Sequence, residues 1–321
     1  MSIVTRQFDA DGDDREVELD SSSIKRLNDR RLLWVDVSGD DGDEVQTVAK
    51  LFDLEPQSLR NLLEPIGQPR LDVLDTYFEV NVVAFAEDER PVPMDLLAGP
   101  NWVITAHHEK AAFLDPFREQ LSGDRNLGKI EAPSFLAALL DWQVGSYFKL
   151  VDDLERAVDE LDERGLKRGD REDRTTLLND LVRLRHRIGR IRRTIAPQRE
   201  VFAGLARPGF EILATSDSAA HFRALQARVE RAIDAVENAR ELLIGSFDLH
   251  MTQTAQRTND VMRVLTIVNV ILLPAVVLAG VMGMNFKVGF FENANLFWVV
   301  IAAMVVIAAA SLGVARWRRW L

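Results

Sequence analysis

Three asparagine side chains, Asn259, Asn269 and Asn285, lie in and beside a long apolar stretch near the end of the sequence. An amide oxygen is a neutral acceptor that can hold a hydrated cation weakly, whereas hydrocarbon offers an amide no hydrogen-bond partner. Asn269 lies inside an uncharged run, so its side chain is expected to face a lumen or another helix. Asn285 ends the sequence "GMN" directly after that run, where an amide is a poor anchor for an apolar helix.

The polar positions fall on one face of a helix. A period near 3.5 residues, typical of helices in a left-handed bundle, connects them with several apolar residues. The predicted face comprises Asn259, Met262, Leu265 or the adjacent Thr266, Asn269, Leu273, Val276 and Gly280. Asp248 lies about three helical turns before Asn259 and in the same phase. A solvated surface acid is the other interpretation of Asp248.

Two uncharged runs, 264–283 and 296–315, are each 20 residues long. At about 1.5 Å per residue, that length matches a hydrocarbon core roughly 30 Å thick. The sequence "RWRRWL" at 316–321 is basic and rich in tryptophan, whereas the connecting segment 284–295 contains only Lys287 as a basic residue. The positive-inside rule therefore predicts that both termini are cytoplasmic, and we expect a multi-pass protein of the cell inner (plasma) membrane. Two buried helices of a soluble core are the alternative.

Composition excludes several classes of function. The formal net charge is −11, so nucleic acid is not an expected partner. The sequence contains no cysteine, which excludes disulfides and thiolate metal sites. It also lacks a glycine-rich phosphate loop and a nucleophile motif, so we expect neither an enzyme nor a cofactor. The sequence "HHE" at 107–109 ends a predicted strand and lacks the spacing of a helical metal site.

Before the apolar runs, the sequence changes from short mixed elements to long helices. Strands are predicted at 31–39, 76–88 and 101–110, with short helices at 43–54 and 55–65. This mixture indicates an α/β domain whose strand order does not follow from the sequence. The expected boundaries are a cytosolic α/β domain at 1–132, a helical region at 133–263, membrane helices at 264–283 and 296–315, an external loop at 284–295 and a basic tail at 316–321.

The helical region contains regular apolar stripes. One stripe comprises Leu177, Leu181, Leu184, Ile188, Ile191 and Ile195, which is the spacing of a coiled coil. From about residue 218 a second helix has no proline until Pro274, so it can continue into the first membrane run. Roughly 65 residues at about 1.5 Å each give a helix near 100 Å long. We interpret it as a stalk between a cytosolic body and a pore; an antiparallel coiled coil is the simpler interpretation.

Several segments together resemble one known family. The sequence "RTNDVMRVLTIVNVILLPAVVLAGVMGMNF" resembles the first transmembrane helix of the CorA family of divalent metal-ion transporters, in which a Gly-Met-Asn triplet closes that helix. The sequences "IRRTIAPQREVFAGL" and "NWVITAHHEK", and the two-span ending with its basic tail, are similar to the same family. The resemblance extends from about residue 101 to 321 and is weak before it.

The resemblance implies a funnel-shaped homopentamer in which long stalk helices line the pore and the second membrane helix faces lipid. It implies uptake of Mg²⁺, with Co²⁺ or Ni²⁺ also carried, so the partners are identical subunits, the lipid bilayer and divalent cations. Mg²⁺ bound between subunits is also a regulatory ligand in this family. We assign no regulatory site, because the family's regulatory pair has no residue-by-residue match here.

The family also implies roles for the predicted face. Asn259 corresponds to a cytosolic polar ring, Met262 and Leu265 to a hydrophobic constriction, Asp248 to an acidic ring, and Gly283, Met284 and Asn285 to the selectivity filter. Two positions depart from the family. Asn269 stands where related pores often have a small apolar residue, and Val276 stands where a threonine is frequent.

The chemistry of Mg²⁺ fits these roles. The ion gives up its inner waters reluctantly, so a ring of Asn285 oxygens with the Gly283 carbonyl would accept hydrogen bonds from a hydrated ion. Neutral oxygens hold such an ion without trapping it, as conduction requires. A collar of Met262 and Leu265 can dewet and stop the ion.

Two alternatives remain open. A ZntB-type zinc transporter coupled to protons shares this architecture, although those relatives commonly have Gly-Val-Asn in place of Gly-Met-Asn. A membrane-anchored coiled-coil scaffold without transport is the second alternative. Polar residues in phase with one another inside the membrane run argue against the scaffold.

Overall fold

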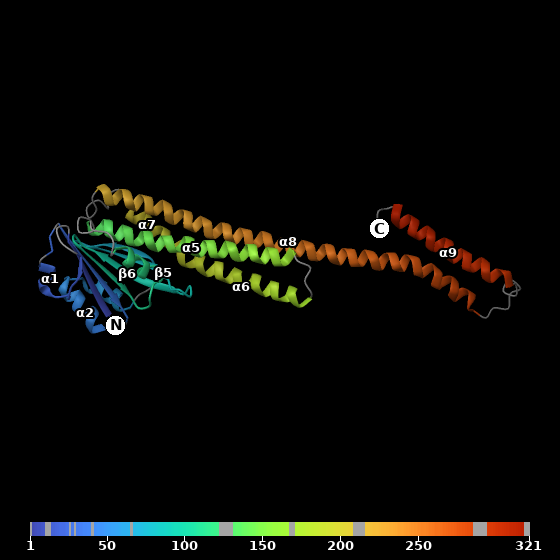
Figure 1. The fold of residues 1–321 in the computed structure, drawn as a ribbon, viewed down its shortest axis with the longest axis horizontal. Coiled ribbons are helices and arrows are strands. Elements are labelled where there is room, and N and C mark those ends of the chain that lie inside the picture. Colours follow the sequence, from blue (N-terminus) through green and yellow to red (C-terminus); the bar gives the residue numbers. More distant parts are fainter. Residues whose placement is uncertain are drawn as a thin grey trace. The chain divides into compact units, whose positions relative to one another are not determined.

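The structure of the protein is a computed structural model (Figure 1). It describes residues 2–9, 14–25, 27–28, 30–39, 42–64, 67–121, 131–166, 171–207, 216–284 and 294–317. The chain divides into two compact units, Met1–Ile244 and Gly245–Leu321. The first unit contains a sheet and several helices, and the second contains the end of one long helix and a further helix.

A seven-stranded sheet with the order β2-β1-β3-β7-β6-β5-β4 forms the centre of the first unit. The strands are β1 (Ser2–Asp9), β2 (Arg15–Glu16), β3 (Arg31–Ser38), β4 (Arg70–Val73), β5 (Phe78–Phe85), β6 (Pro91–Ala98) and β7 (Trp102–His107). Strands β3 and β7 pair in parallel, and the other neighbours pair antiparallel. Because β3 is covered on both faces, its sequence "RLLWVDVS" is almost continuously apolar.

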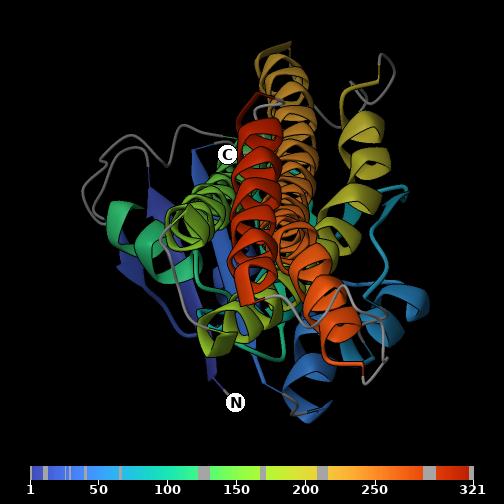
Figure 2. The ribbon, with the colours of Figure 1, turned by 90° about the vertical axis from the view of Figure 1, so that its right-hand side faces the viewer.

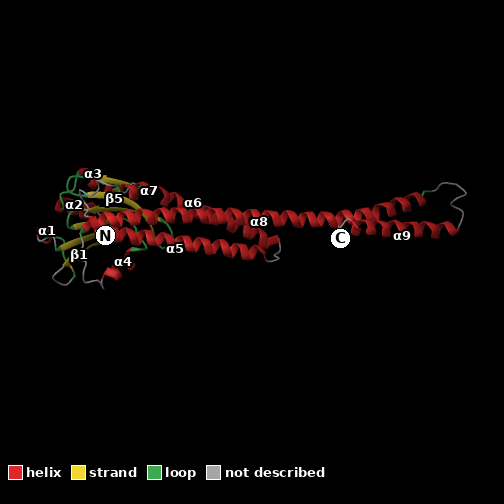
Figure 3. Cartoon of the chain, turned by 90° about the horizontal axis from the view of Figure 1, so that it is seen from above, coloured by secondary structure: helices red, strands yellow, loops and turns green. Residues whose placement is uncertain are grey.

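Helices cover both faces of the sheet (Figure 3). Alternate side chains of a strand point to opposite faces, so β3 contributes to two cores. Leu33 and Val35 lie in the core that contains residues of α2 (Gly42–Leu51) and α3 (Pro56–Leu63). Trp34 lies in the other core, where its ring centroid is 5.7 Å from that of Phe117. That core includes α4 (Leu114–Leu121) and α5 (Ala132–Leu166), while α1 (Ser21–Lys25) is a short helix after β2.

The larger core continues along the long helices, which Figure 2 shows nearly end-on. Helix α6 (Arg171–Ile195) follows α5, and η2 (Ala196–Gln198) and α7 (Arg199–Leu205) follow α6. The apolar stripe predicted for α6 is confirmed. Leu181, Leu184, Ile188, Ile191 and Ile195 are all buried, and Leu177 packs against them. Pro197 lies in η2, directly after this helix.

A buried polar cluster attaches these helices to β5. Val83 pairs with Pro93 of β6, and β4 ends its pairing at Asn81, so another group must satisfy the backbone of Val83. The Gln198 side chain replaces a neighbouring strand: its Oε1 accepts from Val83 N at 3.4 Å, and its Nε2 donates to Val83 O at 3.0 Å. The Tyr147 hydroxyl donates to the same carbonyl at 2.7 Å. Burial raises the pKa of Tyr147, so this hydroxyl keeps its proton.

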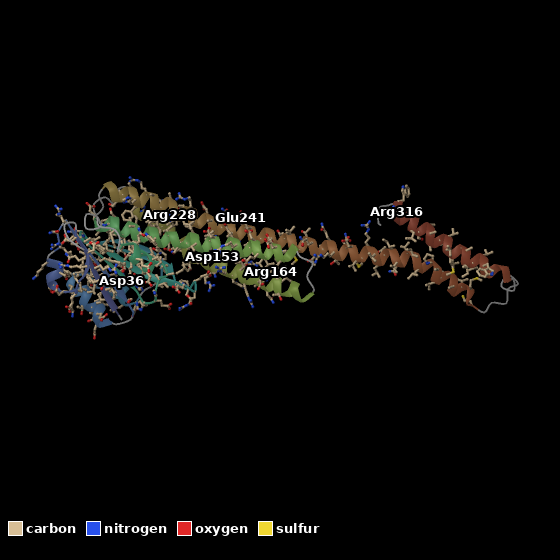
Figure 4. All side chains as sticks on the ribbon, viewed as in Figure 1. Asp36, Asp153, Arg164, Arg228, Glu241 and Arg316 are labelled. Atoms are coloured by element: carbon tan, nitrogen blue, oxygen red, sulfur yellow. The ribbon has the colours of Figure 1, made fainter. Side chains whose placement is uncertain are left out.

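Ion pairs connect the helices at their surfaces, and Figure 4 labels the arginines of two of them, Arg164 and Arg228. Arg228 of α8 (Ser216–Met282) pairs with Asp141 of α5 and lies 5.8 Å from the centre of the Phe148 ring. Arg164 of α5 pairs with Asp180 of α6 at 2.9 Å. Because these groups are partly exposed, each pair contributes about 1 kcal/mol or less. The apolar stripes are therefore the main source of helix packing.

Helix α8 (Ser216–Met282) is 67 residues long and contains Pro274. At about 1.5 Å per residue it is roughly 100 Å long. It begins in the first unit, where Phe222, Leu225 and Val229 are buried, and it ends in the second. Helix α9 (Ala294–Trp317) completes the second unit. The continuous helix predicted from the absence of proline is thus present in the structure.

Candidate functional site

The predicted site residues lie at the end of α8. Every residue predicted for the face, from Asp248 to Gly280, belongs to this helix. Gly283 and Met284 follow it directly, and both are exposed. Asn285 and the rest of the predicted external loop up to residue 293 lie outside the described residues.

One side of α8 packs on α9. The half-buried positions of the apolar run recur at helical spacing. They are Ile267, Ile271, Pro274, Ala275, Leu278 and Met282. On α9 the half-buried positions likewise form one stripe, comprising Val300, Met304, Ile307, Ala308 and Ser311. Figures 1 and 3 show α9 beside α8 and antiparallel to it within the second unit, and we infer that these stripes face each other.

The predicted face lies on the other side of α8. Met262, Leu265, Leu273 and Val276 are 52% to 66% exposed, and Asn269 is also exposed. At about 100° per residue, the centre of this face is roughly 180° from the stripe that contacts α9. The sequence pattern and the packing therefore assign complementary sides of the helix: α9 contacts one side, and the amides lie on the other.

This part of α8 is apolar and uncovered. Among the described helices, one is long and apolar enough to cross a membrane, and its best window has a mean hydropathy of 2.6 with none of it buried. Residues 298–314 of α9 form a shorter apolar helix. An apolar surface of this extent is unfavourable in water. Lipid or further copies of the chain must cover it, which disfavours the core helix of a soluble protein.

The C-terminal end of α8 is suited to a cation. The backbone N–H of Gly283 donates to Ala279 O at 2.9 Å, and that of Met284 donates to Val281 O at 3.3 Å. The last carbonyls of a helix carry a partial negative charge of about half an elementary charge, which attracts cations. This position is where the sequence places Gly283, Met284 and Asn285. The helix end thus adds an attraction that the amide alone does not provide.

His107, the first residue of "HHE" and the last of β7, belongs to a structural cluster. His107 Nε2 lies 3.4 Å from Asp36 Oδ1, and Asp36 also accepts hydrogen bonds from Thr105 and Arg118. Burial alone would raise the pKa of Asp36, but the nearby His107, the hydrogen bond from Thr105 and the charge of Arg118 lower it below its ordinary value. The cluster therefore neutralises a buried carboxylate. Within the described residues, no three His, Asp or Glu side chains could hold a metal ion together.

A second buried acidic cluster was not predicted from the sequence. Glu79 of β5 and Asp95 of β6 are 1% and 2% exposed. Asn81 is the register partner of Asp95 and donates a hydrogen bond to its Oδ1. Asn61 and Arg70 donate to Glu79 Oε1 at 2.7 Å and 3.3 Å. Burial and the charge of Glu79 raise the pKa of Asp95 to about 8, so at neutral pH this carboxyl is protonated.

Replacing Asp95 with asparagine should stabilise the chain above neutral pH. The folded state retains a proton that the unfolded state loses above pH 4, so the wild-type free energy of unfolding falls as the pH rises from about 4 to 8. Asparagine imitates the protonated acid and removes that loss. With each pKa unit worth about 1.4 kcal/mol, the gain at pH 8 is on the order of a few kcal/mol.

Thermal unfolding of the full chain in detergent at pH 5 and pH 8 measures this effect. Asp95→Asn should gain little at pH 5 and much more at pH 8. Asp88→Asn is the matched control, because Asp88 lies on the exposed turn before β6 and pairs with Arg90. An equal gain for Asp95→Asn at both pH values would contradict the assignment.

Comparisons with known proteins decide the family. The sequence pattern described as "CorA-like Mg2+ transporter protein" matches residues 29–314, which is most of the chain. The chain belongs to the CorA family. It is 28% identical over 298 residues to the cobalt/magnesium transport protein CorA of Thermotoga maritima, covering 90% of this chain and 83% of that protein.

Solved structures agree on the fold. The complete structure of the CorA magnesium transporter from Methanocaldococcus jannaschii matches with a TM-score of 0.82 and 21% identity, covering 100% of both chains. The expectation of an α/β domain followed by stalk helices and a C-terminal helical hairpin is confirmed. The ZntB cytoplasmic domain from Vibrio parahaemolyticus also matches, with a TM-score of 0.62 and 12% identity over 80% of this chain and 100% of that domain. The fold of the soluble part is thus shared between the two kinds of protein and does not distinguish them.

Proposed function

We propose that this CorA-family chain conducts divalent metal cations across the plasma membrane, with Mg²⁺ as the main ion and Co²⁺ or Ni²⁺ also carried. The observation that carries the proposal is the face of α8 opposite α9, where two amides, Asn259 and Asn269, lie among apolar residues. Amide side chains are costly on a helix surface that faces lipid, so they normally face a lumen or another helix. Relatives named magnesium or cobalt/magnesium transporters support the choice of ion.

A pore requires several copies of the chain, because one helix cannot enclose a lumen. In the proposed homopentamer, five α8 helices turn this face inward, while α9 lies outside against lipid. Membrane protein folds tolerate polar side chains where they line such a lumen. Both termini are cytoplasmic in this arrangement, and the segment 284–295 is external.

Each level of the proposed pore has a distinct task. Asp248 attracts cations at the cytosolic end, and Asn259 forms a polar ring above it. Met262 and Leu265 form a collar that closes the pore by dewetting. Gly283 and Asn285 select the ion at the outer mouth through its hydration shell. Mg²⁺ as a regulatory ligand belongs to the proposal without an assigned site.

Ion flux into liposomes tests the proposal and separates it from zinc–proton transport. Purified full-length protein is reconstituted, and entry of Mg²⁺, Co²⁺, Ni²⁺ and Zn²⁺ is followed with internal dyes, with and without a pH gradient. Mg²⁺ influx that ignores the pH gradient is expected. Zn²⁺ flux that requires the gradient, without Mg²⁺ flux, would favour the ZntB-like alternative. If no cation enters, the scaffold interpretation prevails.

A further inference from the structure

Asn269 is an unsatisfied polar group inside the apolar run. Between Val264 and Met282 of α8 the polar side chains are Thr266 and Asn269. The Thr266 hydroxyl donates to Met262 O at 2.8 Å, so its helix satisfies it. Within the described part of the chain, the Asn269 amide makes no hydrogen bond. An amide left without a partner in hydrocarbon is costly, so something outside this chain must pair with it.

The position of Asn269 limits what that partner can be. It is exposed and lies on the side of α8 away from α9, so α9 does not supply the partner. Lipid tails have no donors or acceptors. The remaining candidates are water in a lumen and the same amide on another copy of the chain.

The neighbours on the same face favour the lumen. Asn269 follows Leu265 by four residues and Asn259 by ten. At about 1.5 Å per residue, it lies about 6 Å from the level of Leu265 and about 15 Å from that of Asn259. An amide at this level shares its face with the collar and with Leu273, so it divides a long apolar passage into two short ones. Short apolar passages are easier for a hydrated ion to cross.

We propose that the Asn269 side chains of the assembled copies form a polar ring, here called the station. Its amide oxygens accept hydrogen bonds from the water shell of a passing divalent cation. This inference rests on the proposed function and extends it to a second selective level. The oxygens are neutral, so the station binds weakly and releases the ion. A carboxylate at the same level would bind the ion more tightly and slow its release.

Three variants in the full-length protein test the station by Mg²⁺ influx into liposomes. Asn269→Leu, which keeps the size but removes the amide, should lower influx at least tenfold. Asn269→Ser, which restores a hydroxyl acceptor, should recover most of it. Asn269→Asp should reach half-maximal flux at lower Mg²⁺ concentration and show a lower maximum.

The outcomes separate this station from the proposed function. If the wild type conducts Mg²⁺ and Asn269→Leu conducts it equally well, the proposed station is contradicted. The proposed pore is then still supported. If Asn269→Leu loses its assembly in size-exclusion chromatography while Asn269→Ser keeps it, a polar side chain at this position joins neighbouring helices and the station is also wrong. A wild type that carries no cation overturns the pore and the station together.

Discussion

Replacing Asn285 with alanine is expected to reduce Mg²⁺ influx to the level of protein-free liposomes while the protein still assembles. The amide would provide the acceptors that hold the hydrated ion at the end of α8, and alanine removes all of them. The partial negative charge of the helix end remains, but without oriented side-chain oxygens it does not select an ion. The substitution adds no bulk, so packing should be unaffected.

Influx into liposomes and size-exclusion chromatography measure the two parts of this prediction. Asn285→Asp is the informative companion, because a charged ring should bind Mg²⁺ more tightly and release it more slowly. We expect Asn285→Asp to reach half-maximal influx at a lower Mg²⁺ concentration than the wild type and to have a lower maximal influx. Unchanged influx in Asn285→Ala would remove Asn285 from the selectivity site.

Replacing Leu265 with asparagine is expected to open the proposed collar permanently. Leu265 is 52% exposed on α8, on the face away from α9, so the substitution disturbs little packing within the chain. A polar ring at this level holds water and removes the dewetting barrier that closes the pore. Influx should then rise, by about tenfold for each 1.4 kcal/mol removed from the barrier.

Leu265→Val is the matched control, because it keeps the collar apolar and should retain wild-type closure. Both variants are compared in liposomes with low and high internal Mg²⁺. The wild type and Leu265→Val should conduct less when internal Mg²⁺ is high, whereas Leu265→Asn should conduct in both conditions. Closure of Leu265→Asn at high internal Mg²⁺ would place the gate at another level of α8.

The long helices were predictable because their signals are local. The apolar stripe of α6 and the lack of proline before Pro274 are visible in a short window of sequence. The face of α8 could be drawn from the spacing of its amides, and the structure adds that α9 packs on the opposite side. The residues of the site stay a prediction until flux is measured. Asn285, the most specific of them, lies outside the described residues.

Part of the sheet was not predictable, because some strands depend on pairing with distant segments and one contains residues that are unusual in strands. Strand β6 contains Pro91 and Pro93, which normally indicate a loop. Their missing N–H groups are tolerated because β7 ends its pairing at Met94, so no neighbour needs those donors. Strands β1, β2 and β4 and helices α1, α4 and α7 were also not predicted. Their sequences are short or polar, and pairing across the sheet determines them.

The buried acids illustrate the same limit. Glu79 and Asp95 are separated in sequence and sit on different strands. Only the register of β5 with β6 brings Asn81 opposite Asp95 and reveals a carboxyl that must keep its proton. A sequence pattern alone would assign both acids to a solvated surface.

Mg²⁺ influx through the purified wild-type chain in liposomes is the most direct test of the central claim, that the amide-bearing face of α8 lines a cation pore. We predict influx that saturates with Mg²⁺ concentration, exceeds that of protein-free liposomes and disappears in Asn285→Ala. The claim would be contradicted if the wild-type protein assembles correctly in liposomes but lets no more Mg²⁺ enter than protein-free liposomes do.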